Sequence, residues 1–415
     1  MTERSPSPRL AYLVPEFPGQ THAFFWREVE ALEAAGSTVD LVSTTMPKTH
    51  AVHPWAGLAR ARTSYLARPR IPDAAAAALT LSRALVTGRI GTARRRMGSG
   101  PVLERARVLL AAALLAGRSR RAGWMHVHVH SSGNSAQVAM IAAALGPLTY
   151  SVTLHGPLSD YGPQQVEKWR HAAFGLVITE QLRAELAAAV GPEIVDRIAL
   201  APMGIRLADT ERPQPYRPWE GRGDAVLFSC GRLNPAKGHD TLIRAVSILG
   251  DEGLPVRLAI AGEDEAGGSG YRRDLERLIR RLDVADRVQL LGAIGEDAVR
   301  GELQQTHVFV LASRGEPLGV AVMEAMGYGV PAVVGDGGGV RELIEPGTGV
   351  LVRPGDPVAL ADAIRRVLAA PDDARAIGER GRARVRAHFT SESSARVLAE
   401  AIVCRMAERR RPVRP

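Results

Sequence analysis

Short apolar runs alternate with longer segments of helical periodicity along most of the chain. Such runs, rich in aliphatic and β-branched residues, are typical of strands buried on both faces of a parallel sheet. In the first half the runs that predict strands are 10–14, 38–42, 126–129, 150–154, 176–178 and 198–200. In the second half they are 225–229, 257–261, 288–291, 308–311, 332–334 and 350–352. The pattern predicts an α/β fold class with two doubly wound units.

Chain length and a proline-rich break both favour two domains. At 415 residues the chain exceeds one typical core. Residues 204–223 carry three prolines and show no periodicity, which indicates a linker. We therefore expect an amino-terminal domain at 1–203, a carboxyl-terminal domain at 224–388, and a last helix in 389–415 that packs back on the first domain. Two α/β halves joined in this way also predict a ligand cleft between the domains.

Positive charge is concentrated in one part of the chain, whose net charge is +9. Residues 51–121 hold fourteen arginines against only Asp73 and Glu104. We interpret this stretch as an arginine-rich helical insert that contacts an anionic membrane surface or an anionic acceptor. Aromatic residues are nearly absent there, which disfavours base stacking, so no nucleic-acid partner is expected. An apolar helix at 108–115 between arginines suits a membrane interface or a core equally well.

Several features indicate a cytoplasmic protein. No run approaches the ~18 apolar residues of a membrane-spanning helix. The amino terminus lacks the apolar segment of a signal peptide. The two cysteines, Cys230 and Cys404, form no disulfide framework and fit a reducing compartment. The insert could in addition bring the protein to the inner face of the cell membrane.

The stretch from Glu316 to Met326 is the most informative part of the sequence. Glu316 follows the predicted strand 308–311, at the carboxyl end of a parallel strand, where open α/β sheets bind ligands. We expect Glu324 about two turns into the next helix, ~9 Å along its axis. Two carboxylates so placed can hold two hydroxyl-rich parts of one ligand, such as a sugar and a ribose. The helix N-terminus between them offers N–H groups to a phosphate.

A glycine-bounded loop after the predicted strand 225–229 carries two cations. Arg232 and Lys237 lie between Gly231 and Gly238, just before a predicted helix. Two cations at the end of a parallel strand, backed by a helix N-terminus, predict a clamp for a diphosphate. They could also stabilise a departing nucleoside diphosphate without a metal. Taken alone, two solvated surface cations are the alternative.

Two further strand ends carry candidate residues. His155, followed by Gly156, could donate to a sugar hydroxyl or to developing charge; a satisfied loop histidine is the alternative. Gly19 follows the first strand, where the backbone could approach a ligand or form a plain turn. The loop around it is not Gly-x-Gly-x-x-Gly, which disfavours an NAD site. The same two alternatives, ligand approach or turn, apply to the glycines at 337–339.

Three histidines alternate along one predicted strand. His126, His128 and His130 therefore share one face of the sheet. Their spacing is compatible with metal binding, yet no carboxylate or cysteine accompanies them. We expect packing or cleft-wall roles, and no metal site.

The motifs together resemble a known family. Glu316 and Glu324 at their spacing, the following residues 325–331, and the Gly231–Gly238 loop resemble retaining glycosyltransferases of family 4, which have the GT-B fold of two Rossmann-like domains facing a central cleft. The second half carries the specific motifs and the first half matches more loosely. Segments of the first half that resemble exopolysaccharide and colanic-acid-type members are 12–15, 24–32, 126–130, 145–146 and 151–156.

The resemblance implies a role for each matching position. Arg232 and Lys237 would bind the donor diphosphate, Glu316 the donor-sugar hydroxyls and Glu324 the ribose. His155 would lie beside the donor sugar, so that His155, Glu316, Arg232 and Lys237 form the catalytic group. The other positions expected to contact the donor are Gly19, Arg287, Val288, Pro317, Leu318, Gly319 and Val320. Of these, Arg287 and Val288 would offer backbone groups to the base.

The expected function is that of a retaining, metal-independent glycosyltransferase without a cofactor. It would move a sugar from a nucleoside-diphosphate sugar to a hydroxyl of a saccharide or lipid-linked saccharide, in exopolysaccharide or cell-surface glycan synthesis. One alternative is sugar transfer to a small secondary metabolite. Another is a non-catalytic module that only binds nucleotide sugars.

Overall fold

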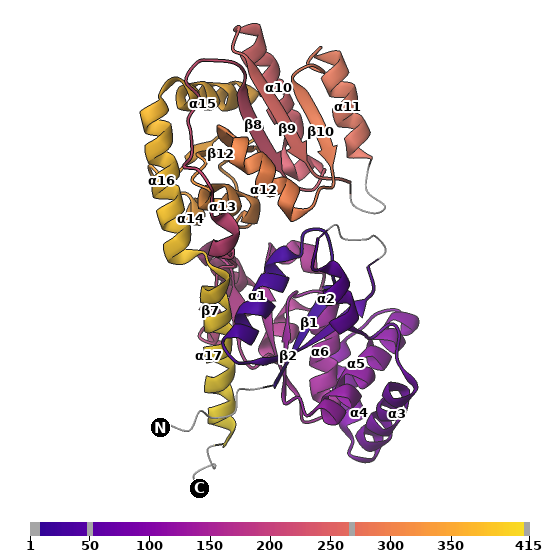
Figure 1. The fold of residues 1–415 in the computed structure, drawn as a ribbon. Coiled ribbons are helices and arrows are strands. Elements are labelled where there is room, and N and C mark those ends of the chain that lie inside the picture. The colour runs from indigo at the N-terminus through magenta and orange to yellow at the C-terminus, as the bar shows by residue number, and fades with distance from the viewer. Residues whose placement is uncertain (1–8, 48–52, 265–269, 411–415) are drawn as a thin grey trace, which may run out of the picture. The chain divides into compact units, whose positions relative to one another are not determined.

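The computed structural model describes residues 9–47, 53–264 and 270–410 and divides into two compact units. Of the described residues, unit 1 holds those up to Pro47, Trp55–Ala201 and those from Ser394 to Arg410. Unit 2 holds His53, Pro54 and the described part of Pro202–Ser393. Each unit is built around its own parallel sheet with helices packed against it (Figure 1). The predicted α/β fold class with two Rossmann-like units is therefore confirmed.

Within the described residues, the sheet of unit 1 has seven parallel strands in the order β3-β2-β1-β4-β5-β6-β7. Their bounds are β1 Arg9–Glu16, β2 Thr38–Thr45, β3 Ser64–Tyr65, β4 His126–Val129, β5 Thr149–Leu154, β6 Gly175–Val177 and β7 Ile198–Leu200. The order reverses between β1 and β4, so their carboxyl ends flank a topological switch point, where such sheets bind ligands. The short strand β3 lies inside the arginine-rich insert, where no strand was predicted.

Helices connect these strands and supply the unit 1 core. Their bounds are α1 Ala23–Ala34, α2 Ala56–Arg62, α3 Ile71–Val86, α4 Arg89–Met97, α5 Val102–Ala122, α6 Asn134–Leu145, η1 Leu158–Tyr161, α7 Gln165–Arg170, α8 Glu180–Val190 and α9 Pro192–Val195. The apolar helix predicted at 108–115 is the middle of α5, where Leu114 and Leu115 are buried. Of the two alternatives for that segment, the structure shows a core helix.

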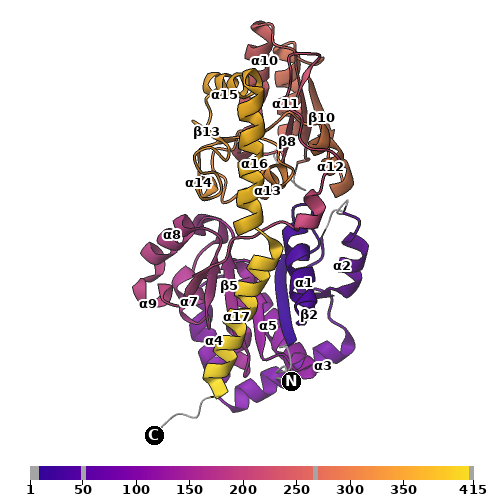
Figure 2. The same cartoon turned by 60° about the vertical axis from the view of Figure 1, so that its left-hand side comes forward.

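The last helix of the chain contributes to the core of unit 1. This helix, α17, spans Ser391–Arg410. Its residues Ala395, Leu398 and Ile402 are buried in one apolar cluster with side chains of β1 and α1. The ribbon of this helix runs alongside unit 1 (Figure 2). A helix from the end of the sequence thus covers strands from its beginning.

Among the residues described in unit 2, the sheet has six parallel strands in the order β10-β9-β8-β11-β12-β13. The strands are β8 Ala225–Cys230, β9 Val256–Ala261, β10 Val288–Gly292, β11 Val308–Leu311, β12 Ala332–Gly335 and β13 Val350–Val352. The helices are η2 Leu207–Thr210, η3 Pro235–Lys237, α10 His239–Asp251, α11 Tyr271–Arg281, α12 Glu296–Gln305, α13 Val320–Gly327, α14 Val340–Leu343, α15 Pro357–Ala369 and α16 Pro371–His388. Apolar side chains of α10, α11 and α15 form one core cluster with the sheet.

The segment at 204–223, expected as a linker, is held along unit 2. The Tyr216 hydroxyl donates to the His307 carbonyl at 2.7 Å. Arg212 donates to the carbonyls of Tyr328 at 3.1 Å and Gln304 at 2.6 Å. These hydrogen bonds fix the segment to the unit that follows it.

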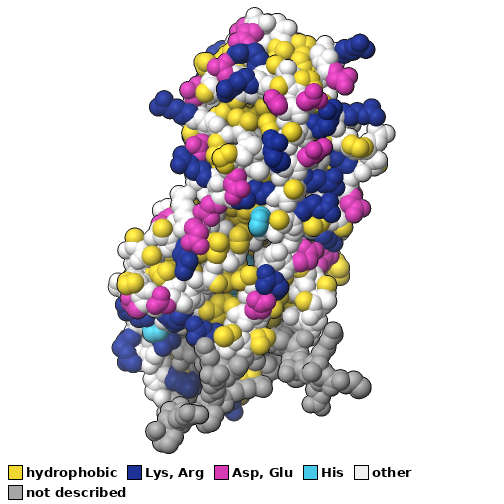
Figure 3. All heavy atoms as spheres, turned by 90° about the vertical axis from the view of Figure 1, so that its left-hand side faces the viewer, with side chains coloured by type: hydrophobic (Ala, Val, Ile, Leu, Met, Phe, Trp, Pro, Cys, Tyr) yellow, Lys and Arg dark blue, Asp and Glu magenta, His cyan; other side chains and the backbone are white. Residues whose placement is uncertain are grey.

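The surface of unit 2 carries mixed charge. On the face that presents α16, acidic and basic side chains are interspersed (Figure 3). No helix in the described part of the chain is both long and apolar enough to cross a bilayer.

Candidate functional site

Lys237 and Glu316 stand 79 residues apart in the chain and form an ion pair in unit 2. Lys237 follows β8 and Glu316 follows β11, and these two strands are parallel neighbours, so both residues lie at the same edge of the sheet. Nζ of Lys237 lies 2.6 Å from Oε2 of Glu316, and their side chains are only 18% and 8% exposed. The Ser313 hydroxyl donates to the same carboxylate oxygen at 3.1 Å. The structure therefore brings together two of the predicted site residues.

A close approach of two backbones at Gly238 makes this pairing possible. Gly238 has a φ of +66°, and a Cβ placed on it would lie 1.9 Å from the carbonyl oxygen of Ala312. Only glycine combines this φ with such a contact at low cost. The loop that carries Arg232 and Lys237 consequently lies directly against the chain that leaves β11. Arg232 is exposed in that loop.

Arg314, which the sequence analysis missed, ties these two loops together. Its backbone N–H donates to the Ala236 carbonyl at 2.8 Å. Its guanidinium donates to the Pro235 carbonyl at 2.8 Å and to Oδ2 of Asp240 at 3.0 Å. The only sequence signal for this role is the position of Arg314 just after a strand.

The glycines after β12 contact the loop that carries Glu316. The Glu316 N–H donates to the Gly337 carbonyl at 2.8 Å. Gly338 has a φ of +79°, and a Cβ there would lie 2.4 Å from the Glu316 carbonyl oxygen. The sequence left two alternatives for these glycines, approach to a ligand or a turn. In the structure, Gly337 and Gly338 lie against the backbone of Glu316.

Glu324 is nearer the start of its helix than predicted. Helix α13 begins at Val320, so Glu324 lies about one turn into it and not two. The reason is that Pro317, Leu318 and Gly319 remain in the loop before the helix. Burial raises the pKa of the Cys230 thiol to about 12, and the charge of Glu324 adds to this rise. The effect of Glu324 on this thiol places its carboxyl group near the carboxyl end of β8. Because its pKa is so high, the Cys230 thiol is protonated and is not a nucleophile.

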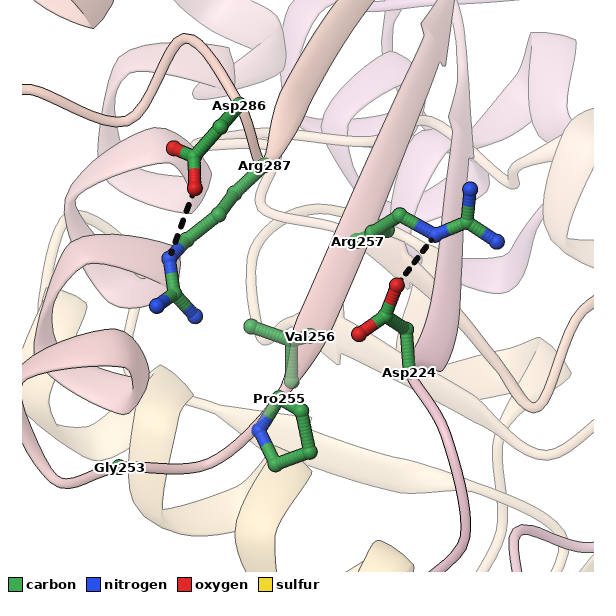
Figure 4. A pocket seen from close by; sticks show the side chains of 7 residues that line it. All are labelled: Asp224, Gly253, Pro255, Val256, Arg257, Asp286 and Arg287. Atoms are coloured by element: carbon green, nitrogen blue, oxygen red, sulfur yellow. Dashed lines mark ion pairs between the residues drawn. The ribbon is translucent and has the colours of Figure 1, made fainter.

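Arg287 and Val288 do not belong to this edge of the sheet. Val288 begins β10 and Arg287 precedes it, so both lie at the amino ends of the strands. There Arg287 lines a pocket with Asp224, Gly253, Pro255, Val256, Arg257 and Asp286 (Figure 4). The expectation that Arg287 and Val288 contact the base of a donor held by Lys237 is inconsistent with this placement. At the edge that holds Lys237, β10 ends at Gly292.

In unit 1, Gly19 and His155 lie at the carboxyl edge of the sheet. Gly19 follows β1 and His155 follows β5, with β4 between these strands. A Cβ on Gly19 would lie 2.6 Å from Nδ1 of His22, so this turn needs glycine for its own packing. Burial, with a smaller effect of His22, lowers the pKa of His155 to about 3. His155 is therefore neutral at physiological pH.

Serine and threonine hydroxyls hold the histidines of β4. The ring of His126 lies 2.8 Å from the Ser151 hydroxyl, and His128 lies 2.7 Å from the same oxygen and 2.8 Å from that of Thr153. Both of these histidines, and His130 just after the strand, are buried. Across the ranges that the structure describes, no group of three or more His, Cys, Asp or Glu residues is arranged to hold a metal ion.

Comparison with known proteins identifies the family of this chain. Residues 218–384 match the family described as glycosyl transferases group 1. An alpha-D-kanosaminyltransferase of Streptomyces kanamyceticus is 32% identical over 278 residues, which cover 61% of this chain and 71% of that protein. The chain belongs to the group 1 glycosyl transferases. It is thus a glycosyltransferase, of the class that uses nucleotide sugars as donors.

Other relatives of this glycosyltransferase match over a shorter span. A GDP-mannose-dependent alpha-(1-6)-phosphatidylinositol monomannoside mannosyltransferase of Mycolicibacterium smegmatis is 33% identical over 221 residues, 49% of this chain and 55% of that protein. A D-inositol 3-phosphate glycosyltransferase of Streptomyces scabiei is 28% identical over 52% of this chain and 50% of its own length. The match to these two relatives thus spans about half of their length.

Solved structures show the same two-unit fold. Sucrose-phosphate synthase from Thermosynechococcus elongatus superposes with a TM-score of 0.73 at 22% identity, covering 96% of this chain and all of that one. Anabaena HepE in complex with UDP and glucose gives a TM-score of 0.73 at 16% identity, covering 95% and 99%. The GT-B glycosyltransferase fold is therefore confirmed.

Proposed function

We propose that unit 2 of this glycosyltransferase binds a nucleoside-diphosphate sugar at the edge that holds Lys237 and Glu316. Arg232 and Lys237 hold the diphosphate, Glu316 accepts hydrogen bonds from the transferred sugar, and Glu324 accepts them from the ribose. The observation that supports this most is the Lys237–Glu316 ion pair, because it sets a cation and a hydroxyl acceptor side by side at a ligand-binding sheet edge. HepE, of the same fold, was crystallised with UDP and glucose.

The proposed reaction retains the configuration of the anomeric carbon. The bond between that carbon and the phosphate oxygen breaks, and its electron pair stays on the phosphate. The acceptor hydroxyl oxygen bonds to the carbon on the same face, and its proton moves to the leaving phosphate oxygen. Arg232 and Lys237 stabilise the negative charge that develops there, which is the task that a metal performs in other transferases. The reaction as proposed uses no metal and no further cofactor.

Binding of nucleoside diphosphates tests the donor proposal. In a thermal-shift panel of UDP, GDP, ADP and dTDP, we expect one nucleotide to stabilise the protein by ~2.7 kcal/mol at about one hundred times its dissociation constant. The same nucleotide should stabilise a Lys237→Ala variant far less. Absence of any shift with all four nucleotides would refute the donor site.

We propose a lipid-linked saccharide as the acceptor, because the insert exposes several large apolar side chains as well as arginines. Eight of the twelve large hydrophobic side chains that are exposed in the described structure lie between residues 58 and 110. They include Ile71 at 87%, Val86 at 86% and Val102 at 82% exposure, at the ends of α3 and α5. Arg94 and Arg95 are exposed on α4 between these helices. Apolar side chains flanked by basic ones fit the surface of an anionic bilayer. The mannosyltransferase relative acts, by its name, on a phosphatidylinositol-based acceptor.

Sedimentation with liposomes tests this second proposal. The protein should bind vesicles that contain anionic phospholipid at low salt and release them at high salt. Replacing Arg94 and Arg95 with glutamine removes about 1 kcal/mol per residue, or roughly thirtyfold in partitioning together. Replacing Arg257 and Arg277, two exposed arginines of unit 2, with glutamine removes the same charge and is the matched control, which should bind like the unchanged protein.

Failure to bind anionic vesicles at low salt would favour the other acceptor class. In that case the acceptor is a small soluble molecule, as the name of the D-inositol 3-phosphate glycosyltransferase relative indicates for that protein. The donor proposal does not depend on this outcome. A place in exopolysaccharide or cell-surface glycan synthesis follows only from the lipid-linked acceptor.

A further inference from the structure

The ring of His239 is buried next to the loop Gly231–Gly238 of unit 2. His239 is the first residue of α10 and directly follows that loop. Its side chain is fully buried, and Nδ1 and Nε2 both lack a hydrogen-bond partner among the residues that the structure describes. Buried polar groups are nearly always paired, so each exception needs an explanation. The place of this ring points to a role in the loop that carries the two cations.

The loop folds back so that its two ends meet near His239. A Cβ placed on Gly231 would lie 3.7 Å from Cδ of Lys237, so the start of the loop lies against the stem of a residue just before α10. Burial lowers the pKa of His239 to about 4, and the backbones of Arg232 and Gly231 oppose this change. Among backbone groups only a carbonyl oxygen can oppose it, because an acceptor favours the protonated ring. The two carbonyl groups therefore face the ring, although neither is aligned for a hydrogen bond.

A small shift of the loop would pair the ring with one of these carbonyls. The neutral ring has one N–H donor, and a buried donor without an acceptor costs free energy. Arg232 and Lys237 lie toward opposite ends of the loop. A diphosphate held by both would draw them together, because each side chain forms charge-assisted hydrogen bonds with its oxygens. Such a movement carries the backbone at Arg232 toward the start of α10.

We infer that His239 is a positioning residue for the diphosphate, whose ring donates to the backbone carbonyl of Gly231 or Arg232 when the bound diphosphate draws Arg232 toward Lys237. The new hydrogen bond then holds the loop in its binding shape. A ligand shifts such an equilibrium only if it binds the aligned loop better, and this hydrogen bond adds to that preference. The inference rests on the proposed donor site and concerns unit 2 alone.

His239→Leu in the full chain should have opposite effects on stability and on binding. Without nucleotide, the midpoint of unfolding in urea should be no lower than in the unchanged protein, because an apolar side chain replaces a buried ring with unpaired nitrogens. Affinity for the nucleotide that stabilises the unchanged protein, among UDP, GDP, ADP and dTDP, should fall about tenfold, the value of one net hydrogen bond. A lower midpoint with unchanged affinity would show that His239 only supports the fold.

Two kinds of variant show whether the ring N–H is responsible. His239→Asn and His239→Gln each keep an N–H donor, and at least one of them should recover part of the lost affinity. Recovery in neither would contradict the inference. Ser229→Ala is the matched control, because the Ser229 hydroxyl of β8 is also buried without a partner in the described structure. This control should keep full affinity, and a loss equal to that of His239→Leu would mean that any buried polar group has this effect.

Nuclear magnetic resonance of the unchanged protein observes the new hydrogen bond directly. The ring N–H proton of His239, assigned by its absence in His239→Gln, should move downfield when the nucleotide is added to saturation. An unmoved signal would overturn the inference, and this measurement decides if His239→Leu fails to fold. If the unchanged protein binds none of the four nucleotides, the donor site is refuted and the inference with it. Equal binding by the unchanged protein and His239→Leu refutes the inference alone.

Discussion

Replacing Lys237 with alanine should lower kcat/KM for the nucleotide sugar by about 10²–10³-fold, the usual cost of removing one group that stabilises charge in a transition state. The variant loses the cation that we place at the leaving diphosphate. It also leaves the buried carboxylate of Glu316 without its ion-pair partner, 2.6 Å away in the unchanged protein. Initial rates of sugar release or transfer, measured over a range of donor concentrations, give the ratio directly.

The matched control removes a cation from the opposite edge of the same sheet. Arg257 forms an ion pair with Asp224 at 2.9 Å, and both side chains are well exposed (Figure 4). Arg257→Ala should change stability by no more than ~0.5 kcal/mol and leave kcat/KM unaltered. Equal losses in both variants would mean that any lost cation weakens the enzyme. A Lys237→Ala variant with a near-normal rate and a normal melting temperature would contradict the proposed site.

Substituting alanine for Gly238 should destabilise unit 2 by about 3 kcal/mol or more, from backbone strain and overpacking together. Its φ of +66° is unfavourable for alanine, and the added Cβ would meet the Ala312 carbonyl oxygen at 1.9 Å. Relief of that contact requires the loop that carries Lys237 to move away from Glu316. Donor affinity should therefore fall together with the free energy of unfolding, measured in urea.

Gly253 offers a control that isolates the strain. Its φ of +78° is similar, but nothing lies within 4 Å of a Cβ placed on it. Gly253→Ala should cost only the backbone term, about 1–2 kcal/mol, and should not affect donor affinity. If the two substitutions cost the same, the contact between Gly238 and Ala312 is not what holds the two loops together.

The strands other than β3 could be predicted from the sequence because each contains a short, largely apolar run. The run 308–311 is strand β11 and the run 350–352 is strand β13, without any shift. Strand β3 was not predicted, because its two residues, Ser64 and Tyr65, are too few to show a periodic pattern. Its pairing with β2 depends on tertiary contacts that no local pattern records.

The site was predictable where residues follow strands. The ends of parallel strands share an edge, and this places Lys237 near Glu316 without any knowledge of distances. By the same rule, Arg287 precedes a strand and therefore lies at the opposite edge of the sheet from Lys237, where it cannot contact the same donor. The sequence alone was enough to show this. The start of α13 at Val320 and the contacts of Arg314 depend on loop packing, which sequence patterns do not reveal.

The place of α17 in the unit 1 core has a consequence for synthesis of the protein. Its buried residues Ala395, Leu398 and Ile402 leave the ribosome only after all of unit 2. Until then, the apolar side chains of β1 and α1 that they cover lack part of their packing. Unit 2 is continuous from Pro202 to Ser393 apart from a short earlier segment. It can therefore fold before the α17 residues that complete the core of unit 1 have been synthesised. The order of folding on the ribosome is therefore expected to run against the order of the two units in the chain.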